Sequence, residues 1–114
     1  MITGLGSTLA GLNVFGKKTS NAAGNVANSV ADGYKKTRAD IVEDNNGLPT
    51  VDVVQINTPG SLIPDSEGNV RESSNVDLSE EIGQMIVAQR GYEANLKAFK
   101  IQDETLGSLF DIIA

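Results

Sequence analysis

The chain carries few of the side chains that usually do chemistry at neutral pH. Its 114 residues include no histidine and no cysteine. The usual ligands of a zinc site, a thiol nucleophile and a Ser-His-Asp triad are therefore absent. Because most neutral-pH catalysis depends on one of these groups, the composition indicates that the protein is not an enzyme.

Carboxylates are the remaining reactive groups, with 15 Asp and Glu in the chain. Two of them could meet in the fold, so a carboxylate-dependent hydrolase stays as a minor alternative. No aromatic platform for a sugar accompanies them, since Tyr34, Tyr92 and the three Phe residues mostly follow helical spacing. A core role is the more common one for aromatics at such positions.

Three short motifs resemble ligand sites. Gly4-Leu5-Gly6 resembles part of a dinucleotide loop, but no strand can precede it and the third glycine is missing. The runs 44–47 and 65–68 resemble calcium loops, but glycine stands fourth in each, whereas an EF-hand places it sixth. We interpret both runs as ordinary turns, and we expect neither a metal nor a cofactor.

Charge and hydropathy also exclude some partners. The net charge of -6 argues against nucleic acid, whose binding relies on clustered Lys and Arg. The local cluster of Lys35, Lys36 and Arg38 favours a solvated corner over a small anion site. No run reaches the ~20 apolar residues of a membrane span, and "MITGLGSTLAGLNVFGKK" lacks the basic start of a cleavable signal peptide.

The first 33 residues predict an amphipathic helix, because apolar and small residues recur every three or four positions. Each glycine lowers helix propensity by up to ~1 kcal/mol, so this helix should form mainly when packed; an irregular terminus is the alternative. Asp32-Gly33 predicts its end, after which Tyr34 can fold back. The N-terminal seam comprises Ile2, Leu5, Leu9, Leu12, Gly16, Thr19, Ala23, Val26 and Val30.

The middle of the chain predicts a small β-hairpin or meander. Ile41-Val42 and the alternating apolar residues from Val51 to Ile56 flank an Asn-Gly turn. Leu62-Ile63 predicts a brief extended piece, and the turn at 67–69 leads to Val70. A two-stranded hairpin is barely stable alone, so it should lie against a helix.

The clearest pattern is a long C-terminal helix. Asp77 can cap its start, and Glu80 can return the bond as in a capping box. Thirty-six residues would extend ~54 Å at 1.5 Å per residue. The C-terminal seam comprises Leu78, Ile82, Met85, Gln89, Tyr92, Leu96, Phe99, Asp103, Leu106, Phe110 and Ile113.

These elements predict an α+β fold, with long N- and C-terminal helices in coiled-coil-type packing and a small β-hairpin or meander between them. We divide the chain into an N-terminal helical axial segment (1–33), a corner with a small β insert (34–77) and a long C-terminal helix (78–114), together one domain. The two seams can pair, but the longer one keeps apolar surface that calls for neighbours. Assembly into many subunits is the favoured interpretation, and an adaptor that binds one helical partner is the alternative.

Two stretches resemble the axial proteins of the bacterial flagellar rod and hook. "NVANSVADGYKK" (25–36) is similar to their N-terminal pattern Asn-Ile-Ala-Asn, spacer, Thr-Pro-Gly-Tyr-Lys-Arg. "NVDLSEEIGQMIVAQRGYEANLKAFKIQDETLGSLFDI" (75–112) is similar to their closing helix. The resemblance covers about the first 38 and last 40 residues, and it is greatest to the short C-type proximal rod proteins.

The resemblance implies a structural subunit whose terminal helices pack in the inner tube of the rod, the axial drive shaft of the basal body. It implies export, unfolded and without a cleavable signal, through the flagellar type III apparatus. The implied partners are other rod proteins and further copies of the chain. Basal-body ring components and the export apparatus are additional candidate partners. Neither nucleic acid binding nor direct membrane insertion is expected. The implied assembly residues are Leu5, Leu9, Leu12, Asn25, Asn28, Gly33, Tyr34, Leu78, Ile82, Met85, Gln89, Arg90, Tyr92, Glu93, Asn95, Leu96, Phe99, Leu106 and Phe110.

The chain departs from the family pattern in three places. Ala31-Asp32 replaces the usual Thr-Pro, so no proline fixes the corner. Gly91 replaces the common Ala, at a cost of ~1 kcal/mol in helix propensity. The segment 41–74 has no close resemblance. If the assignment holds, Tyr92→Ala or Asn95→Ala should abolish motility while secretion continues.

Overall fold

The computed structural model describes residues 2–113, with side chains from residue 4 onward. Along the chain, one long helix precedes and another follows two small antiparallel sheets, so the predicted α+β class is confirmed. In chain order the elements are α1 (Ile2–Ala27), β1 (Thr37–Glu43), β2 (Pro49–Gln55), β3 (Leu62–Pro64), β4 (Val70–Glu72) and α2 (Leu78–Ile113).

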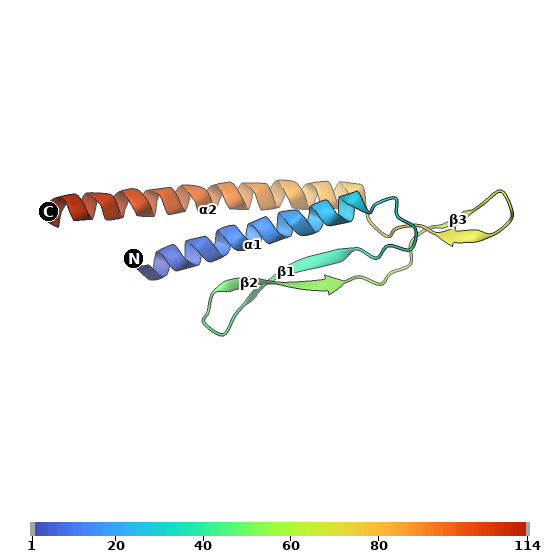
Figure 1. The fold of residues 1–114 in the computed structure, drawn as a ribbon, viewed down its shortest axis with the longest axis horizontal. Coiled ribbons are helices and arrows are strands. Elements are labelled where there is room, and N and C mark those ends of the chain that lie inside the picture. The colour runs from blue at the N-terminus through green and yellow to red at the C-terminus, as the bar shows by residue number, and fades with distance from the viewer. Residues whose placement is uncertain (1, 114) are drawn as a thin grey trace.

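The molecule is long and narrow, with extents of 78 × 26 × 14 Å. α1 and α2 lie side by side along the long axis, and α2 continues past the start of α1 (Figure 1). The β1–β2 hairpin lies along α1 on the side away from α2, and the β3–β4 hairpin projects from the far end. Among the helices and strands described, α2 packs against α1 alone.

The buried core is small and lies on one side of α1. Val14 and Ala22 are buried there together with the polar Thr8 and Asn25. The Thr8 hydroxyl donates to the Gly4 carbonyl oxygen at 2.9 Å, so its polar group is satisfied within the helix. The core therefore consists mainly of small side chains that let other backbones approach α1 closely.

The predicted helix end at Asp32-Gly33 is wrong. α1 ends at Ala27, and residues 28–33 form turns. The backbone N–H groups of Asn28 and Ser29 donate three residues back, and the Asn28 amide donates to the Gly24 carbonyl at 2.8 Å. These tighter bonds close the helix early. Val30, predicted on the N-terminal seam, is consequently 89% exposed.

The first predicted hairpin is confirmed. β1 and β2 pair antiparallel, with Ala39 opposite Val53. At the turn, the Asp44 carboxylate accepts from the backbone N–H groups of Asn46 and Leu48, and Gly47 has φ +76°. Ala39 is buried against α1, while most other residues of the two strands are exposed or half-buried. The hairpin depends on α1 for its support, as expected.

A second, shorter hairpin follows the same design. β3 and β4 pair with Leu62 opposite Glu72. Asp65 accepts from the backbone N–H groups of Glu67 and Asn69, and Gly68 has φ +87°. Both acidic runs that resembled calcium loops are thus Asp-anchored turns, in which the carboxylate binds backbone N–H groups of its own loop.

α2 begins at Leu78, as predicted, and runs for 36 residues to Ile113. Asp77 caps it by accepting from the backbone N–H groups of Ser79 and Glu80, at 3.0 and 3.4 Å. The return bond of a capping box is absent from the described residues, because the Glu80 carboxylate pairs instead with Lys36 at 3.1 Å. Neither described helix is apolar over the length that crossing a bilayer requires.

Candidate assembly surface

The chain turns from α1 into β1 around the buried side chain of Asn25. Its Oδ1 accepts from the backbone N–H of Thr37 and from the Tyr34 hydroxyl, both at 3.0 Å. Its Nδ2 donates to the Thr37 carbonyl oxygen at 2.8 Å. One amide therefore holds the start of β1 against α1 and fixes the ring of Tyr34, with its polar atoms satisfied.

The side-chain amide of Asn75 likewise holds separate backbone segments together, at the other end of the corner. Its Oδ1 accepts from the backbone N–H of Lys36 at 2.7 Å, and its Nδ2 donates to the carbonyl oxygens of Ile56 and Thr58 at 2.8 and 3.0 Å. Sequence reasoning did not select Asn75 as a functional residue. The sequence feature that could have identified Asn75 is its position two residues before the capping Asp77, where the chain must pass from the hairpins into α2.

Glu72 joins three separate backbone segments. Its carbonyl oxygen accepts from the N–H of Gly33 at 2.9 Å, and its carboxylate accepts from Lys35 and from the N–H of Gly60. The Lys35 ammonium, aided by the Gly60 N–H, holds the pKa of the Glu72 carboxyl below its ordinary value. Gly33, at φ +70°, thereby ties the turn after α1 to β4.

The basic cluster at residues 35–38 is more ordered than a solvated corner. Lys35 and Lys36 are half-buried and form ion pairs with Glu72 and Glu80. Arg38 remains exposed and donates to both oxygens of Asp40, which keeps the pKa of the Asp40 carboxyl below its ordinary value. Lys35 and Lys36 therefore connect the segment before β1 to β4 and α2, so the expected solvated corner is wrong for them.

The contact between α1 and α2 uses small and polar positions rather than the two predicted seams. The Phe15 ring lies over Gly91, where a methyl group would come within 2.5 Å of it. Asn95 lies over Gly11 in the same way, at 2.7 Å from the position of such a methyl. The Thr8 hydroxyl also lies 3.0 Å from Gln102 Oε1, to which it can donate in place of the Gly4 carbonyl oxygen.

Pairing of the two seams within the chain by coiled-coil packing is not confirmed. In α1, Leu9 is 52% exposed, and Leu5 and Leu12 are only half-buried. Leu12 follows the buried Gly11 by one residue, which is about 100° around the helix. The N-terminal seam therefore lies beside the contact with α2, on a side of α1 that its own chain covers only in part.

The C-terminal seam is similarly displaced. Ala88 and Glu81 are the buried residues of α2, and the seam lies to one side of them. Only Met85, Phe99 and Leu106 of its apolar members are half-buried. The exposed apolar members are Leu78, Ile82, Tyr92, Leu96, Phe110 and Ile113.

Further exposed apolar residues, which the seam did not include, lie around the rest of α2: Ile86, Val87, Ile101, Leu109 and Ile112. Their signal in the sequence was the absence of a long polar face on this helix. α2 is thus apolar over more of its circumference than one partner helix can cover.

The polar residues assigned to assembly make contacts within α2. Gln89 and Arg90 donate to Glu93, both at the long distance of 3.4 Å, and all three are exposed. Asn95 is half-buried and donates to the Gly91 carbonyl at 3.0 Å. Asn25 and Tyr34 meet at the corner, whereas Asn28 binds only its own helix.

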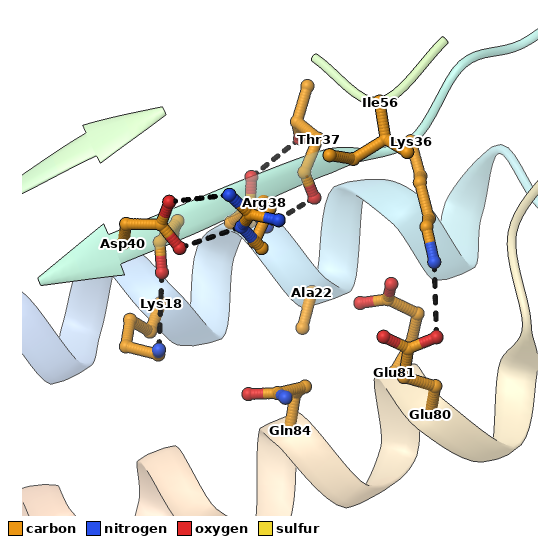
Figure 2. Close-up of a pocket in the computed structure, with 12 residues that line it drawn as sticks. Lys18, Ala22, Lys36, Thr37, Arg38, Asp40, Ile56, Glu80, Glu81 and Gln84 are labelled. Atoms are coloured by element: carbon orange, nitrogen blue, oxygen red, sulfur yellow. Dashed lines mark hydrogen bonds and ion pairs between the residues drawn. The ribbon is translucent and has the colours of Figure 1, made fainter. Parts of the chain in front are cut away.

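A groove of about 260 Å³ lies where α1, β1 and α2 come together. Figure 2 shows Lys36 reaching from the corner to Glu80 on α2, and Arg38 paired with Asp40 on β1. Glu81 and Gln84 of α2 also line it. No group of three metal-ligating side chains occurs here or elsewhere in residues 2–113, so these residues suit a polar contact better than a metal.

The C-terminal part of the chain matches a known protein family. The family model of the flagellar basal body rod FlgEFG protein C-terminal segment matches residues 67–112. The chain is 51% identical over 41 residues to the flagellar hook protein FlgE of Escherichia coli (strain K12), an alignment that covers 36% of this chain and 10% of the hook protein.

Two further relatives agree. The chain is 37% identical over 68 residues to FlgE of Helicobacter pylori (strain ATCC 700392 / 26695), covering 60% of this chain and 9% of that protein. It is 49% identical over 51 residues to the basal-body rod protein FlgG of Borreliella burgdorferi, covering 40% and 19%. The chain therefore matches a fifth or less of the length of these relatives. Residues 67–112 are thus similar to the C-terminal segment of flagellar hook and basal-body rod proteins.

Proposed function

We propose that this chain is a structural, non-enzymatic subunit of the bacterial flagellar basal-body rod. It assembles with itself and with other rod proteins, through α1 and α2, into the axial drive shaft. The similarity of its two end segments to C-type proximal rod proteins narrows the proposal to that class. Similarity to flagellar hook and rod proteins supports the structural role.

The observation that carries the proposal is the uncovered apolar surface of α2. This helix packs on α1 along one side through Gly91, Asn95 and Ala88, and no other described element covers it. Ile82 remains 52% exposed and Phe110 67% exposed. Exposed apolar side chains repeated along a helix of this length mark an interaction surface.

Neighbouring copies would cover this surface by coiled-coil-type packing. The N-terminal seam and the C-terminal seam lie beside the contact between α1 and α2, so each chain can present both to other chains. The intrachain contact then sets the distance and angle between the seams. Within this proposal, residues 1–33 and 78–114 are the axial segments, and residues 34–77 form the outer corner and insert.

The location and route follow from the same proposal. The chain would lie in the periplasm-spanning rod of the basal body, after export through the flagellar type III apparatus without a cleavable signal. The many glycines and other small residues of α1 support such a route, since a segment of low helix propensity unfolds easily before it packs. Ring components are the neighbours expected around the outer hairpins.

The test is sedimentation velocity of the purified chain over a concentration series, with far-UV circular dichroism at each concentration. We expect an open series of larger species, which Ile82→Glu on the C-terminal seam should abolish. Leu62→Glu is the matched control, because Leu62 is an exposed apolar residue of β3 in the outer hairpin, outside both helices and both seams. The control variant should associate like the wild type.

Two results would contradict the proposal. A monomer at all concentrations, with full helicity, would mean that the uncovered surface is not used for self-association. A closed complex of fixed size with a single helical partner would support the adaptor instead. Equal association of both Glu variants would show that the C-terminal seam is not the interface.

A further inference from the structure

Glu81 is a buried acid whose carboxylate has no partner in the described part of the chain. It is only 5% exposed and lines the groove between α1, β1 and α2. Its carboxylate points from α2 toward α1 near Ala22 (Figure 2). Among the hydrogen bonds and ion pairs of residues 4–113, none reaches this carboxylate. A buried charge in that state is normally compensated by a donor.

The cations of the groove are directed elsewhere. Lys36 pairs with Glu80 at 3.1 Å, and Arg38 pairs with Asp40 at 2.8 Å. Lys18 donates to the Ala39 carbonyl oxygen at 3.2 Å. Glu81 lies in the first turn of α2, and this position gives its carboxylate no hydrogen bond.

The carboxylate of Glu81 can be reached through the groove. Within the described residues, no fully buried side-chain nitrogen or oxygen lacks a hydrogen-bond partner. Because the Glu81 oxygens have no such partner, they must keep contact with the groove and its solvent. The groove holds about 260 Å³, and a water takes about 30 Å³. It can therefore admit an ammonium or guanidinium group with the end of its side chain.

We infer that this groove receives a lysine from a second copy of the chain, an inference that rests on the proposed self-assembly. Lys97 and Lys100 are exposed, lie one turn apart on α2 and have no partner among the described residues. They line a patch with Ala94, Leu96 and the ion pair of Arg90 and Glu93, so that the two lysines supply its excess positive charge. This patch offers positive charge and apolar contact together, which complements a groove holding an uncompensated carboxylate.

The geometry requires two copies that are shifted along the helix axis. Lys97 lies about 24 Å along α2 from Glu81, and Lys100 about 28 Å, at 1.5 Å per residue. Neither lysine can reach the groove of its own chain over that distance. A second copy displaced by this amount brings its lysines to the groove, and the same contact can repeat on each new copy. Such a head-to-tail contact produces an open series rather than a closed dimer.

The test is a double-mutant cycle on the full chain, read by sedimentation velocity. Glu81→Gln keeps the shape of the side chain and removes its charge, and Lys97→Met with Lys100→Met removes the proposed donors. Each change should weaken association about tenfold, and the combined variant should be no weaker than either alone. Glu104→Gln, an exposed acid of α2, is the matched control and should associate like the wild type.

The outcomes separate this inference from the proposed function. If the wild type associates, and the Glu81→Gln and lysine variants associate equally well, the inference is overturned and the proposed function is not. Additive losses from the two changes would also overturn it, since they would place Glu81 and the lysines in different contacts. A wild type that never associates would overturn the proposed function itself. Far-UV circular dichroism of each monomer excludes loss of folding as the cause.

Discussion

Asn25 of α1 and Thr37 of β1 pair through both faces of a single amide. The Asn25 Nδ2 donates to the Thr37 carbonyl oxygen at 2.8 Å, and its Oδ1 accepts from the Thr37 N–H at 3.0 Å. This is the hydrogen-bond pattern of a neighbouring strand, supplied here by a helix side chain. It explains how a helix rich in small residues holds a hairpin without a large apolar core.

Asn25→Ala should therefore destabilise the corner. The N–H of Thr37 and the hydroxyl of Tyr34 would lose their acceptor, and each unsatisfied buried group costs about 1–3 kcal/mol. We expect urea denaturation to show a loss in the free energy of unfolding of that order. Asn28→Ala is the control, because Asn28 binds only the Gly24 carbonyl, and its loss should be about 1 kcal/mol or less. Equal losses would contradict the role of Asn25.

Gly91→Ala should destabilise the contact between the helices although alanine is the better helix former. An added methyl would come within 2.5 Å of the Phe15 ring. Overpacking costs about 1–3 kcal/mol, which outweighs the propensity gain of about 1 kcal/mol. Thermal denaturation should show a lower melting temperature.

Gly83→Ala provides the contrast on the same helix. Nothing lies within 4 Å of a methyl at Gly83, so this variant should gain about 1 kcal/mol. If Gly91→Ala also raised the melting temperature, the close contact between Phe15 and α2 would be wrong.

The ion pair of Glu72 should make the corner sensitive to acid. The pKa of the Glu72 carboxyl is held below its ordinary value of 4.5, chiefly by Lys35. The folded state therefore binds this proton less readily than the unfolded state. The stabilisation is complete above about pH 4.5 and is lost as the pH falls through the lower, folded pKa.

Urea denaturation between pH 7 and pH 3 measures this dependence. Glu72→Gln should reduce the fall in stability at acidic pH, and Lys35→Met should reduce it in part, because the Gly60 N–H still favours the charged carboxylate. A pH profile identical to that of the wild type in both variants would exclude Glu72 as a contributor.

Tyr92→Ala and Asn95→Ala should separate assembly from folding. Tyr92 is exposed on the C-terminal seam, so its loss should change monomer stability by less than about 0.5 kcal/mol. Asn95 contacts Gly11 of α1 and should cost about 1 kcal/mol. If the proposed function holds, both variants should be secreted but fail to restore swimming in a deletion strain. Wild-type swimming by both would remove these residues from the assembly surface.

The sequence predicted those features that neighbouring residues determine. Asp77 marked the start of α2, and the turns at Gly47 and Gly68 were recognisable, because each carboxylate binds N–H groups within four residues. Pairing of β3 with β4 as a second hairpin was not predicted. Helical periodicity also identified the two long helices. It could not choose which face of each helix the other covers, since several faces of α2 are apolar.

The tertiary structure decided that choice. Phe15 over Gly91 and Asn95 over Gly11 allow the two backbones to approach closely, so the small and polar positions form the intrachain contact. Packing of the large apolar residues there would hold the two helices apart. Most members of the seams that the sequence defined therefore remain at the surface. Glu81 becomes buried without a hydrogen-bond partner, because only the folded chain brings α1, β1 and α2 together around it.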